Sequence, residues 1–453
     1  MNTTRRQFLQ HLAPVAGIMV APNLLRAANL NGRLQHACIG VGGMMGFNDF
    51  QNFRQHPRTD VVAICDVDAG NLERALKEVP NARPYRDWRE MLAKEGGRID
   101  SINATVPDHM HAAICLSAMR AGKHVYCQKP MCHDVAEIRA LTRLAAEKRL
   151  KTQLGNQHSS GAGDRMTVEY LKAGVIGHIK HVYLCSNRTS GMAYRLDQPK
   201  PPAAPVPATL DWDLWLGTAP ARPYARDVYH PSKWRTWLDF GTGWSGDIGC
   251  HIFSAPWKGL GLKAPLSIEA RVNRSWQESP ALRAQLWARA DHITWVFPGN
   301  ELTGGRELTV EWFDGVEPDF YIPEEFRKLY PGERFPEEAA LLIGEEGALL
   351  LPHTSGPQLL PRDKFAKVPR PKTKGENHYH SFANSILDDT PCESSFDQSG
   401  PMSEAVILGT VAVRTPGVKL EWDAQALKIP NSAEADGLLR RSYREGWHIE
   451  GLG

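Results

Sequence analysis

The sequence predicts an α/β protein with two domains, an N-terminal one with a doubly wound parallel sheet and a C-terminal α+β one with an open, mostly antiparallel sheet. Its 453 residues exceed what a single hydrophobic core usually holds. From residue 33 to about 155, strand-like apolar runs alternate with helical periods, which is typical of parallel sheets with helical crossovers. Later apolar runs carry one polar face, as antiparallel strands do. We therefore place the domains at residues 33–155 and 156–453.

Each element of the first domain has its own signal. Strands are expected in LQHACI, VVAICDVD, DSINATVP and HVYCQ, at residues 34–39, 61–68, 100–107 and 124–128. After the first strand, Phe47, Phe50 and Phe53 recur at helical spacing. Helices are also expected in NLERALKEV, in HAAICLSAMRAG and between Val135 and Ala145. Strand and helix thus alternate throughout this half.

The second half begins with a different composition. PKPPAAPVPAT, at residues 199–209, predicts a proline-rich loop. Five tryptophans follow within residues 210–245; such rings stack on sugars in some proteins but more often fill cores. The runs HITWVF, ELTVEWF and EGALLLP, at 292–297, 307–313 and 346–352, predict antiparallel strands. No internal repeat is present in the sequence.

Composition and charge exclude several classes of protein. Hydrophobic residues make up 42% and charged residues 23%, as in soluble globular proteins. The formal net charge is +2, and it becomes −1 without the three arginines of residues 1–28. A protein with so small a net charge is not expected to bind nucleic acid.

The eight cysteines form no CxxC pair, so we expect buried free thiols, with an export-dependent disulfide as the alternative.

Residues 1–28 have the pattern of a signal peptide. A basic start precedes an apolar stretch without acids, and small residues follow near Ala27 and Ala28. The stretch from Thr4 to Leu9, TRRQFL, resembles a twin-arginine export signal. We expect a periplasmic or otherwise exported protein that uses the twin-arginine export machinery and is not stably inserted in a membrane after processing. An uncleaved anchor is the alternative, but the apolar run is shorter than the roughly 20 residues of a span.

GVGGMMG lies at the turn where such a sheet binds a dinucleotide. Gly40 allows a tight turn, and Gly42 lets backbone N–H groups approach a pyrophosphate at the helix start. The G-x-G-x-x-G pattern is broken because Met45 occupies its third glycine position and Gly46 follows. An ordinary strand-to-helix turn is therefore the alternative.

Asp66 closes the next strand about 20 residues further on, where an acid holds the ribose hydroxyl of NAD. No arginine follows it directly, which favours NAD over NADP; a turn-capping role is the alternative. Together these features predict a Rossmann domain. The candidate cofactor-binding residues are Gly40, Gly42, Gly43, Met44, Met45, Asp66, Thr105, Pro107, His111 and Lys129.

Two further stretches carry groups suited to catalysis. HVYCQKPMCHD places Lys129 directly after a strand, at the sheet edge where ligands bind, although a surface lysine is the alternative. WSGDIGCH places Asp247 and His251 four residues apart, on one face of a helix. Such a pair can also be structural, or can bind zinc or manganese if His378 or His380 folds back to it. We predict no metal site.

These motifs resemble those of the glucose-fructose oxidoreductase, inositol dehydrogenase and rhizopine catabolism (Gfo/Idh/MocA) family, in its exported twin-arginine branch. CQKP stands where that family has E-K-P, and GVGG, CDVD, TVPDHMH, YLKAGVIGHIKHV, GTVAVR and LLRRSYREGW follow the family's order. The resemblance extends from about residue 34 to the end. The chain departs from the family at Gln128, where glutamate is usual, and at Met45, where a small residue is usual.

The resemblance implies roles for the candidate residues. Lys129 would hydrogen-bond the reacting hydroxyl, His251 would be the general acid or base, and Asp247 would orient the substrate or the imidazole. It also implies a homo-oligomer, a dimer or tetramer, formed through the second domain. Residues expected to face the substrate, with ordinary loop contacts or core packing as the alternative, are Asn156, His158, Tyr229, Trp234 and Trp244.

The expected function is an NAD(P)-dependent oxidoreductase acting on a hydroxyl of a sugar, glycoside or polyol. Outside the cytoplasm no ready pool of NAD exists, so the cofactor would stay tightly bound and be recycled internally. One alternative is a redox-neutral, NAD-dependent glycoside hydrolase with a 3-keto intermediate, and a simple sugar dehydrogenase also remains open. A different class is a non-catalytic sugar- or nucleotide-binding protein on the same fold.

Overall fold

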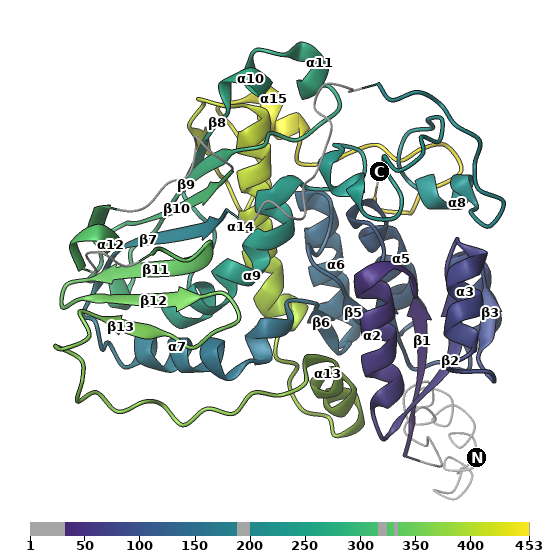
Figure 1. Ribbon diagram of the computed structural model, residues 1–453, viewed down its shortest axis with the longest axis horizontal. Coiled ribbons are helices and arrows are strands. Elements are labelled where there is room, and N and C mark those ends of the chain that lie inside the picture. The colour runs from purple at the N-terminus through teal and green to yellow at the C-terminus, as the bar shows by residue number, and fades with distance from the viewer. Residues whose placement is uncertain (1–31, 188–199, 316–323, 330–333, 453) are drawn as a thin grey trace, which may run out of the picture.

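The computed structural model of the chain describes residues 32–187, 200–315, 324–329 and 334–452 (Figure 1). The predicted twin-arginine signal at residues 1–28 lies outside the described residues. The two sheets that the structure contains stand on either side of two long helices near the centre of Figure 1.

The first sheet is parallel throughout and has the order β3-β2-β1-β4-β5-β6, as the sequence predicts for a Rossmann domain. Its strands are β1 (Leu34–Ile39), β2 (Thr59–Cys65), β3 (Arg83–Tyr85), β4 (Ser101–Ala104), β5 (His124–Cys127) and β6 (Thr152–Leu154). Its helices are α2 (Gly43–Gln55), α3 (Ala69–Leu76), α4 (Trp88–Glu95), α5 (Asp108–Arg120) and α6 (Val135–Lys148). The sequence analysis did not identify β3, which has only three residues, or α4.

The second sheet has eight strands in the order β13-β12-β11-β7-β10-β9-β8-β14. All neighbours are antiparallel except β7 and β10, so the prediction of a mostly antiparallel sheet is confirmed. Its strands are β7 (Ile179–Ser186), β8 (Ser267–Val272), β9 (Asp291–Phe297), β10 (Leu308–Asp314), β11 (Glu338–Gly344), β12 (Ala348–Pro352), β13 (Gln358–Leu360) and β14 (Leu420–Glu421).

Three helices cover one face of this sheet: α7 (Ala162–Lys172), α9 (Gly243–Leu260) and α14 (Phe396–Arg414). Helix α14 contacts both β8 and α6, so it packs between the two domains (Figure 1). The other helices are α8 (Trp212–Leu216), α10 (Arg274–Gln277), α11 (Pro280–Arg283), α12 (Glu324–Leu329), α13 (His378–Leu387) and α15 (Ala433–Gly437), with 3₁₀ turns η1 (Gln157–Ser160), η2 (Lys233–Thr236) and η3 (Glu301–Thr303).

The tryptophan-rich segment, residues 200–240, packs against the Rossmann domain. The amide of Ala69 donates to the carbonyl of Thr209 at 2.9 Å, and the amide of Asp211 donates to the carbonyl of Val67 at 3.0 Å. In Figure 1 this segment, with α8, lies above α3. Most of its aromatic rings form a buried cluster. The second domain thus reaches over the edge of the first sheet where β2 ends.

The C-terminal tail also ties the domains together. Arg441 Nη2 donates to Glu137 Oε1 at 2.7 Å and to the carbonyl of His109 at 2.6 Å. The hydroxyl of Tyr443 donates to the same oxygen of Glu137, also at 2.7 Å. Because the Glu137 side chain is only 2% exposed, this is a buried charge whose partners come from a distant part of the sequence.

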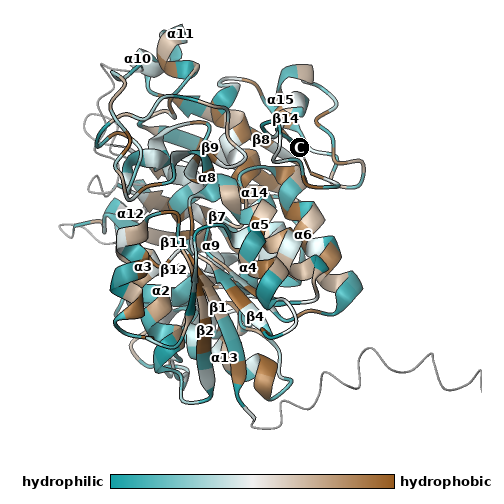
Figure 2. Cartoon of the chain, turned by 90° about the vertical axis from the view of Figure 1, so that its right-hand side faces the viewer, coloured by the Kyte–Doolittle hydropathy of each residue, from teal (hydrophilic) through white to brown (hydrophobic). Residues whose placement is uncertain are grey.

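Hydrophobic residues are concentrated in the interior strands and on the inner helix faces (Figure 2). All eight cysteines are free, and seven are buried, which confirms the prediction of free thiols. Among the residues described, no helix has both the length and the apolar character needed to cross a bilayer.

We expect Arg441→Met to lower the free energy of unfolding by about 3 kcal/mol, because it leaves the buried Glu137 carboxylate without its cation. Urea unfolding, followed by tryptophan fluorescence, measures this change. Arg274→Met, which breaks an exposed pair with Glu278, is the control and should leave the unfolding midpoint unchanged. An equal effect of both substitutions would contradict this account of the tail.

Candidate active site

The turn between β1 and α2 is built around closely packed glycines. Gly40 has a φ of +81°, and a Cβ there would lie 2.0 Å from the carbonyl oxygen of Thr105. A Cβ on Gly46 would lie 2.9 Å from the carbonyl oxygen of Gly40. Gly46 therefore allows the close contact between helix and strand that the third glycine of the motif usually allows. The exposed Met44 and the partly exposed Met45 do not obstruct this contact.

Helix α2 begins at Gly43, and no side chain of the described residues caps its start. Its first N–H groups and the positive end of its dipole are therefore available to an anion. A pyrophosphate fits this arrangement, and the small residues at Gly42 and Gly43 keep side chains out of its way.

Asp66, directly after β2, lies beside this turn. Its Oδ2 accepts a hydrogen bond from the amide of Val41 at 3.0 Å, and its Oδ1 accepts from the amide of Asp68 at 3.0 Å and from Asn71 Nδ2 at 3.2 Å. Burial raises the pKa of the carboxyl, while these hydrogen bonds lower it. The acid is fixed where the ribose of a dinucleotide lies, so the observed turn and acid fit NAD.

The loop after β4 and the first turn of α5 hold three more predicted cofactor residues. Thr105 donates to Asp49 Oδ2 at 2.7 Å, and Pro107 is the N-cap of α5. The ring nitrogens of His111 lie 2.7 and 2.9 Å from the carbonyl oxygens of Pro130 and Val106. His111 thus braces the turn that carries Lys129. Direct contact of these residues with the cofactor stays a prediction.

The central feature of the site is an ion pair between the domains. Lys129, after β5, donates from Nζ to Oδ1 of Asp247 on α9 at 2.8 Å and to the Asp247 carbonyl at 2.9 Å. The two side chains are 10% and 6% exposed. Arg235 Nε lies 3.4 Å from the same carboxylate oxygen, and its guanidinium covers the ring of Trp234. Burial alone would raise the pKa of Asp247, but Lys129 and Arg235 outweigh it and hold the pKa below its usual range.

His251 lies one turn further along α9. Its Nδ1 is buried and has no hydrogen-bond partner among the described residues. Its ring centroid is 5.4 Å from that of His353 and 6.1 Å from that of His158. Burial, followed by the charge of Lys129 and the neighbouring histidines, lowers its pKa well below the usual imidazole value. The ring is therefore neutral at neutral pH and able to accept a proton.

Helix α9, which carries Asp247 and His251, packs against α14. A Cβ on Gly249 would lie 3.1 Å from Cγ1 of Val406 on α14, so the glycine lets the two helices pack closely. The predicted helical placement of Asp247 and His251 is confirmed.

The predicted substrate residues fall in two groups. Asn156 is 1% exposed and donates from Nδ2 to Ser254 Oγ at 3.1 Å, while its Oδ1 has no hydrogen-bond partner among the described residues. Together with His158, it lies at the His251 end of the site. Tyr229 and Trp234 belong to the buried aromatic cluster of residues 200–240, and Trp244 donates to the Ser186 hydroxyl at 2.9 Å. Their contact with a substrate stays a prediction.

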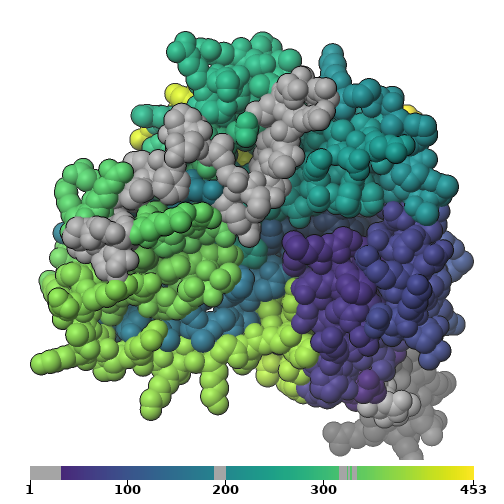
Figure 3. Space-filling view, in the orientation of Figure 1, coloured from purple at the N-terminus to yellow at the C-terminus, as the bar shows by residue number. Residues whose placement is uncertain are grey.

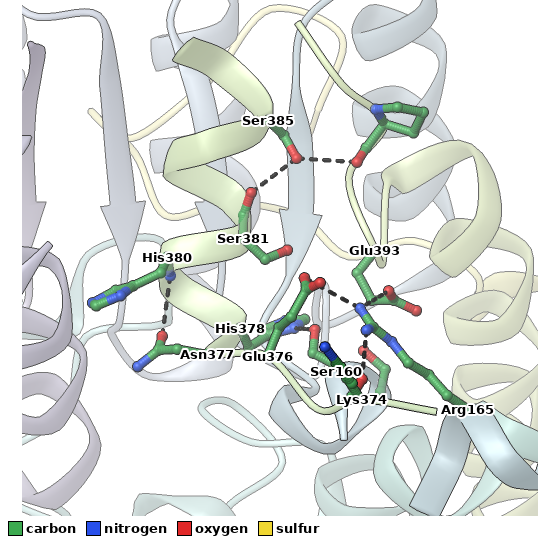
Figure 4. Close-up of polar contacts among 12 residues, drawn as sticks. Ser160, Arg165, Lys374, Glu376, Asn377, His378, His380, Ser381, Ser385 and Glu393 are labelled. Carbon is green, nitrogen blue, oxygen red and sulfur yellow. Dashed lines mark hydrogen bonds and ion pairs between the residues drawn. The ribbon is translucent and has the colours of Figure 1, made fainter. Parts of the chain in front are cut away.

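The histidines considered as metal ligands have other partners (Figure 4). His378 Nδ1 lies 2.6 Å from Ser160 Oγ, and its Nε2 donates to the carbonyl of Leu154 at 2.8 Å. His380 Nε2 donates to the carbonyl of Asn52 on α2 at 3.1 Å. Across the described ranges, no three His, Cys, Asp or Glu side chains are arranged to hold a metal ion.

Gln128, which stands where the resembled family usually has glutamate, lies beside the buried acid Asp49. Gln128 Nε2 donates to Asp49 Oδ2 at 2.8 Å, and its Oε1 accepts from the amide of Lys129 at 3.1 Å. Tyr379 donates to Asp49 Oδ1 at 2.6 Å. Burial raises the pKa of Asp49 to about 6, against these hydrogen bonds. The amide at position 128 thus joins the lysine to a buried acid on α2.

Three site residues were missed by the sequence reading: Asp108, Arg235 and His353. Asp108 stands in TVPDHMH at a strand end, a position that could have marked it, and Arg235 stands beside the tryptophan that was chosen. His353 has no such signal, because only the fold brings it near α9. Figure 3 shows a hollow where the purple N-terminal residues meet the teal segment above them, at the junction of the domains.

Two family models match the chain. Residues 34–156 match the family model described as "Oxidoreductase family, NAD-binding Rossmann fold". Residues 170–294 match the one described as "Oxidoreductase family, C-terminal alpha/beta domain". The two matches belong to one family and together cover more than half of the chain.

Individual relatives share low sequence identity with this chain. Over 208 residues the chain is 24% identical to glycosyl hydrolase family 109 protein 1 of Shewanella sp. (strain MR-4), covering 40% of this chain and 45% of that protein. Over 106 residues it is 27% identical to an inositol 2-dehydrogenase of Salmonella paratyphi B, covering 23% of this chain and 31% of that protein. The matched regions thus span less than half the length of these curated relatives.

Among solved structures, the fold is similar to the WlbA dehydrogenase from Bordetella pertussis, determined in complex with NADH and UDP-GlcNAcA. The TM-score is 0.60 at 16% identity, covering 87% of this chain and 98% of that chain. At this identity the likeness shows the shared fold.

We expect Asp66→Asn to weaken NAD binding about tenfold, because the amide replaces an acid positioned for the ribose hydroxyls. Titration calorimetry with NAD measures the change, and NADP binding should not weaken in parallel. Asp60→Asn, on strand β2 just before Asp66 but in an exposed pair with Arg33, is the control and should bind NAD normally. Normal NAD affinity in the Asp66 variant would contradict the assignment of the ribose site.

Proposed function

The chain belongs to the Gfo/Idh/MocA oxidoreductase family and has its NAD-binding Rossmann domain, and from this premise we propose that it oxidises a hydroxyl group of a sugar, glycoside or polyol. The observation that carries the proposal is the buried pair of Lys129 and Asp247, with the neutral His251 one helical turn away. This pair lies at the carboxyl end of β5, where the nicotinamide half of a dinucleotide binds in such sheets.

Each of the site residues has a separate role in the proposed reaction. The glycine turn and Asp66 would hold NAD, which would supply the hydride acceptor for the carbinol carbon. Lys129 Nζ donates a hydrogen bond to the reacting oxygen, and Asp247 holds the ammonium in place through its 2.8 Å contact. His251 accepts the hydroxyl proton, so that hydride and proton both leave and a carbonyl remains. In the reverse direction the same imidazole returns the proton.

The substrate class is supported by relatives. The inositol 2-dehydrogenase is named for a polyol, and the WlbA structure holds NADH with a nucleotide sugar. NAD is proposed over NADP because both oxygens of Asp66 are already ordered beside the turn, where a phosphate would meet a buried acid.

A second candidate is a redox-neutral glycoside hydrolase, which the relative in glycosyl hydrolase family 109 favours. Oxidation at C3 makes the C2 proton acidic, its loss expels the C1 substituent, and water addition and reduction then complete the cycle. The same Lys129 and His251 serve both routes. Turnover in D₂O separates them, because only the hydrolase route places deuterium at C2 of the released sugar.

Export by the twin-arginine pathway, a resident cofactor and a homo-oligomer complete the proposal. They rest on TRRQFL at residues 4–9, on the lack of NAD outside the cytoplasm, and on the resemblance to the family. Cell fractionation of a variant in which lysines replace Arg5 and Arg6 tests export. A signal that works through the two arginines predicts that this variant stays in the cytoplasm.

We expect Lys129→Ala and His251→Ala each to lower kcat/KM by about 10²–10⁴, because each removes a group that acts on the reacting hydroxyl. Nucleotide binding should stay close to normal, since the glycine turn and Asp66 are untouched. The matched controls are Lys94→Ala and His380→Ala, whose side chains contact Glu90 and Asn52 outside the site. Full activity in either site variant would remove that residue from the mechanism.

The pH profile tests the state of His251. Its pKa is lowered in the folded protein, so the imidazole stays an available base below the ordinary value of about 6.5. Oxidation should therefore be lost on the acid side only well below pH 6.5, as the ring becomes protonated. Rates of carbohydrate oxidation across pH 4–7, with the fold checked by circular dichroism, measure this. An acid limb centred at or above 6.5 would contradict the proposed base.

A further inference from the structure

A second carboxyl, that of Asp108, lies beside the ion pair of the site. Asp108 is the first residue of α5, directly after Pro107, so it stands at the carboxyl edge of the sheet. It is 1% exposed. The Thr242 hydroxyl, just before α9, donates to its Oδ2 at 3.0 Å. Its Oδ1 is buried and has no hydrogen-bond partner among the described residues.

The charged groups that act on Asp108 come from three elements. They are Asp247 on α9, Arg235 on η2 and Lys129 after β5. The neighbouring thiols of Cys127 and Cys250 are neutral, because burial raises the pKa of both. One carboxylate and two cations thus already occupy the site, and Lys129 and Arg235 both direct nitrogens to Oδ1 of Asp247.

Burial and then the charge of Asp247 raise the pKa of Asp108 to about 8, against the opposing effects of Arg235, Lys129 and Thr242. Below that pH the carboxyl carries a proton. Above it, a second anion would repel Asp247 and compete with it for the Lys129 ammonium. The buried, unpartnered Oδ1 is where a protonated acid can carry its hydrogen without disturbing the Thr242 contact.

We propose that Asp108 is a further positioning residue of the site, which as a neutral acid keeps Asp247 as the single carboxylate partner of Lys129. This inference rests on the proposed oxidoreductase function, since Lys129 acts on the substrate and Asp108 acts through Lys129 and Asp247. It predicts that Asp247 is the only ionised carboxylate beside Lys129 as long as Asp108 is protonated.

The decisive variant is Asp108→Asn, which has the shape of the protonated acid but cannot ionise. In the wild type, kcat/KM should fall on the alkaline side with a midpoint near 8. In Asp108→Asn this fall should disappear, with the rate at pH 7 within about threefold of wild type. Loss of more than about tenfold at pH 7, or an unchanged alkaline fall, would overturn the proposal.

A second variant tests the same group without removing it. Thr242→Val takes away a hydrogen bond that favours the carboxylate form of Asp108, so the alkaline fall should move to higher pH. The control is Asp164→Asn on α7, a partly buried acid whose pKa burial raises to about 7 but which lies near Lys258 and Glu393 instead. It should leave the pH profile unchanged. A Thr242 variant with an unshifted profile would contradict the inference.

An infrared measurement that needs no enzymatic activity tests the protonation of Asp108 independently of the proposed function. At pH 7, the infrared difference spectrum between wild type and Asp108→Asn should contain the carbonyl band of one protonated carboxylic acid. If no carbohydrate is oxidised but the band is present, the proposed function fails and the protonated state of Asp108 stands. Absence of the band overturns the proposal whatever the activity.

Discussion

The ion pair between Lys129 and Asp247 is the interaction on which the rest of the site depends. It joins the end of β5 in the first domain to α9 in the second, at 2.8 Å and with both side chains nearly buried. A buried ion pair is costly to desolvate and adds little stability by itself, so its position is better explained by function. Helix α14 packs on both α9 and α6, so it connects the helix that carries Asp247 to the first domain.

The groups around this pair are arranged to limit its charge. His251 is neutral because burial and the nearby cation disfavour its protonated form, and burial together with the nearby carboxylate of Asp247 disfavours the ionised form of Asp108. Arg235 adds a second cation to the same carboxylate. The result is a site with one anion, two cations and a neutral base. This balance suits a step in which negative charge develops on an alcohol oxygen as its proton leaves.

The sequence alone predicted much of the fold, because strands and helices alternate in the first domain and apolar runs mark several strands of the second. Burial alternates along β9 as expected for one polar face, whereas β12 is buried on both faces over most of its length. Lys129, Asp247 and His251 were reachable from strand ends, helix spacing and family resemblance. Asp108 and Arg235 were missed although each stands in or beside a motif that the sequence analysis singled out, whereas His353 could not be found, because only the fold brings it near α9. The sequence did not show that Tyr229 and Trp234 belong to one buried aromatic cluster, because a run of rings does not reveal how the rings pack; their contact with a substrate stays a prediction.

The most direct test of the account is to identify the nucleotide in the protein purified without added cofactor, before and after exposure to sugars, glycosides and polyols. The protein is denatured, and the released compound is identified by mass and absorbance. The account predicts one nicotinamide dinucleotide per chain, with the reduced share rising when a carbohydrate substrate is present. A protein that releases no nicotinamide, and that also fails to bind added NAD, would contradict it.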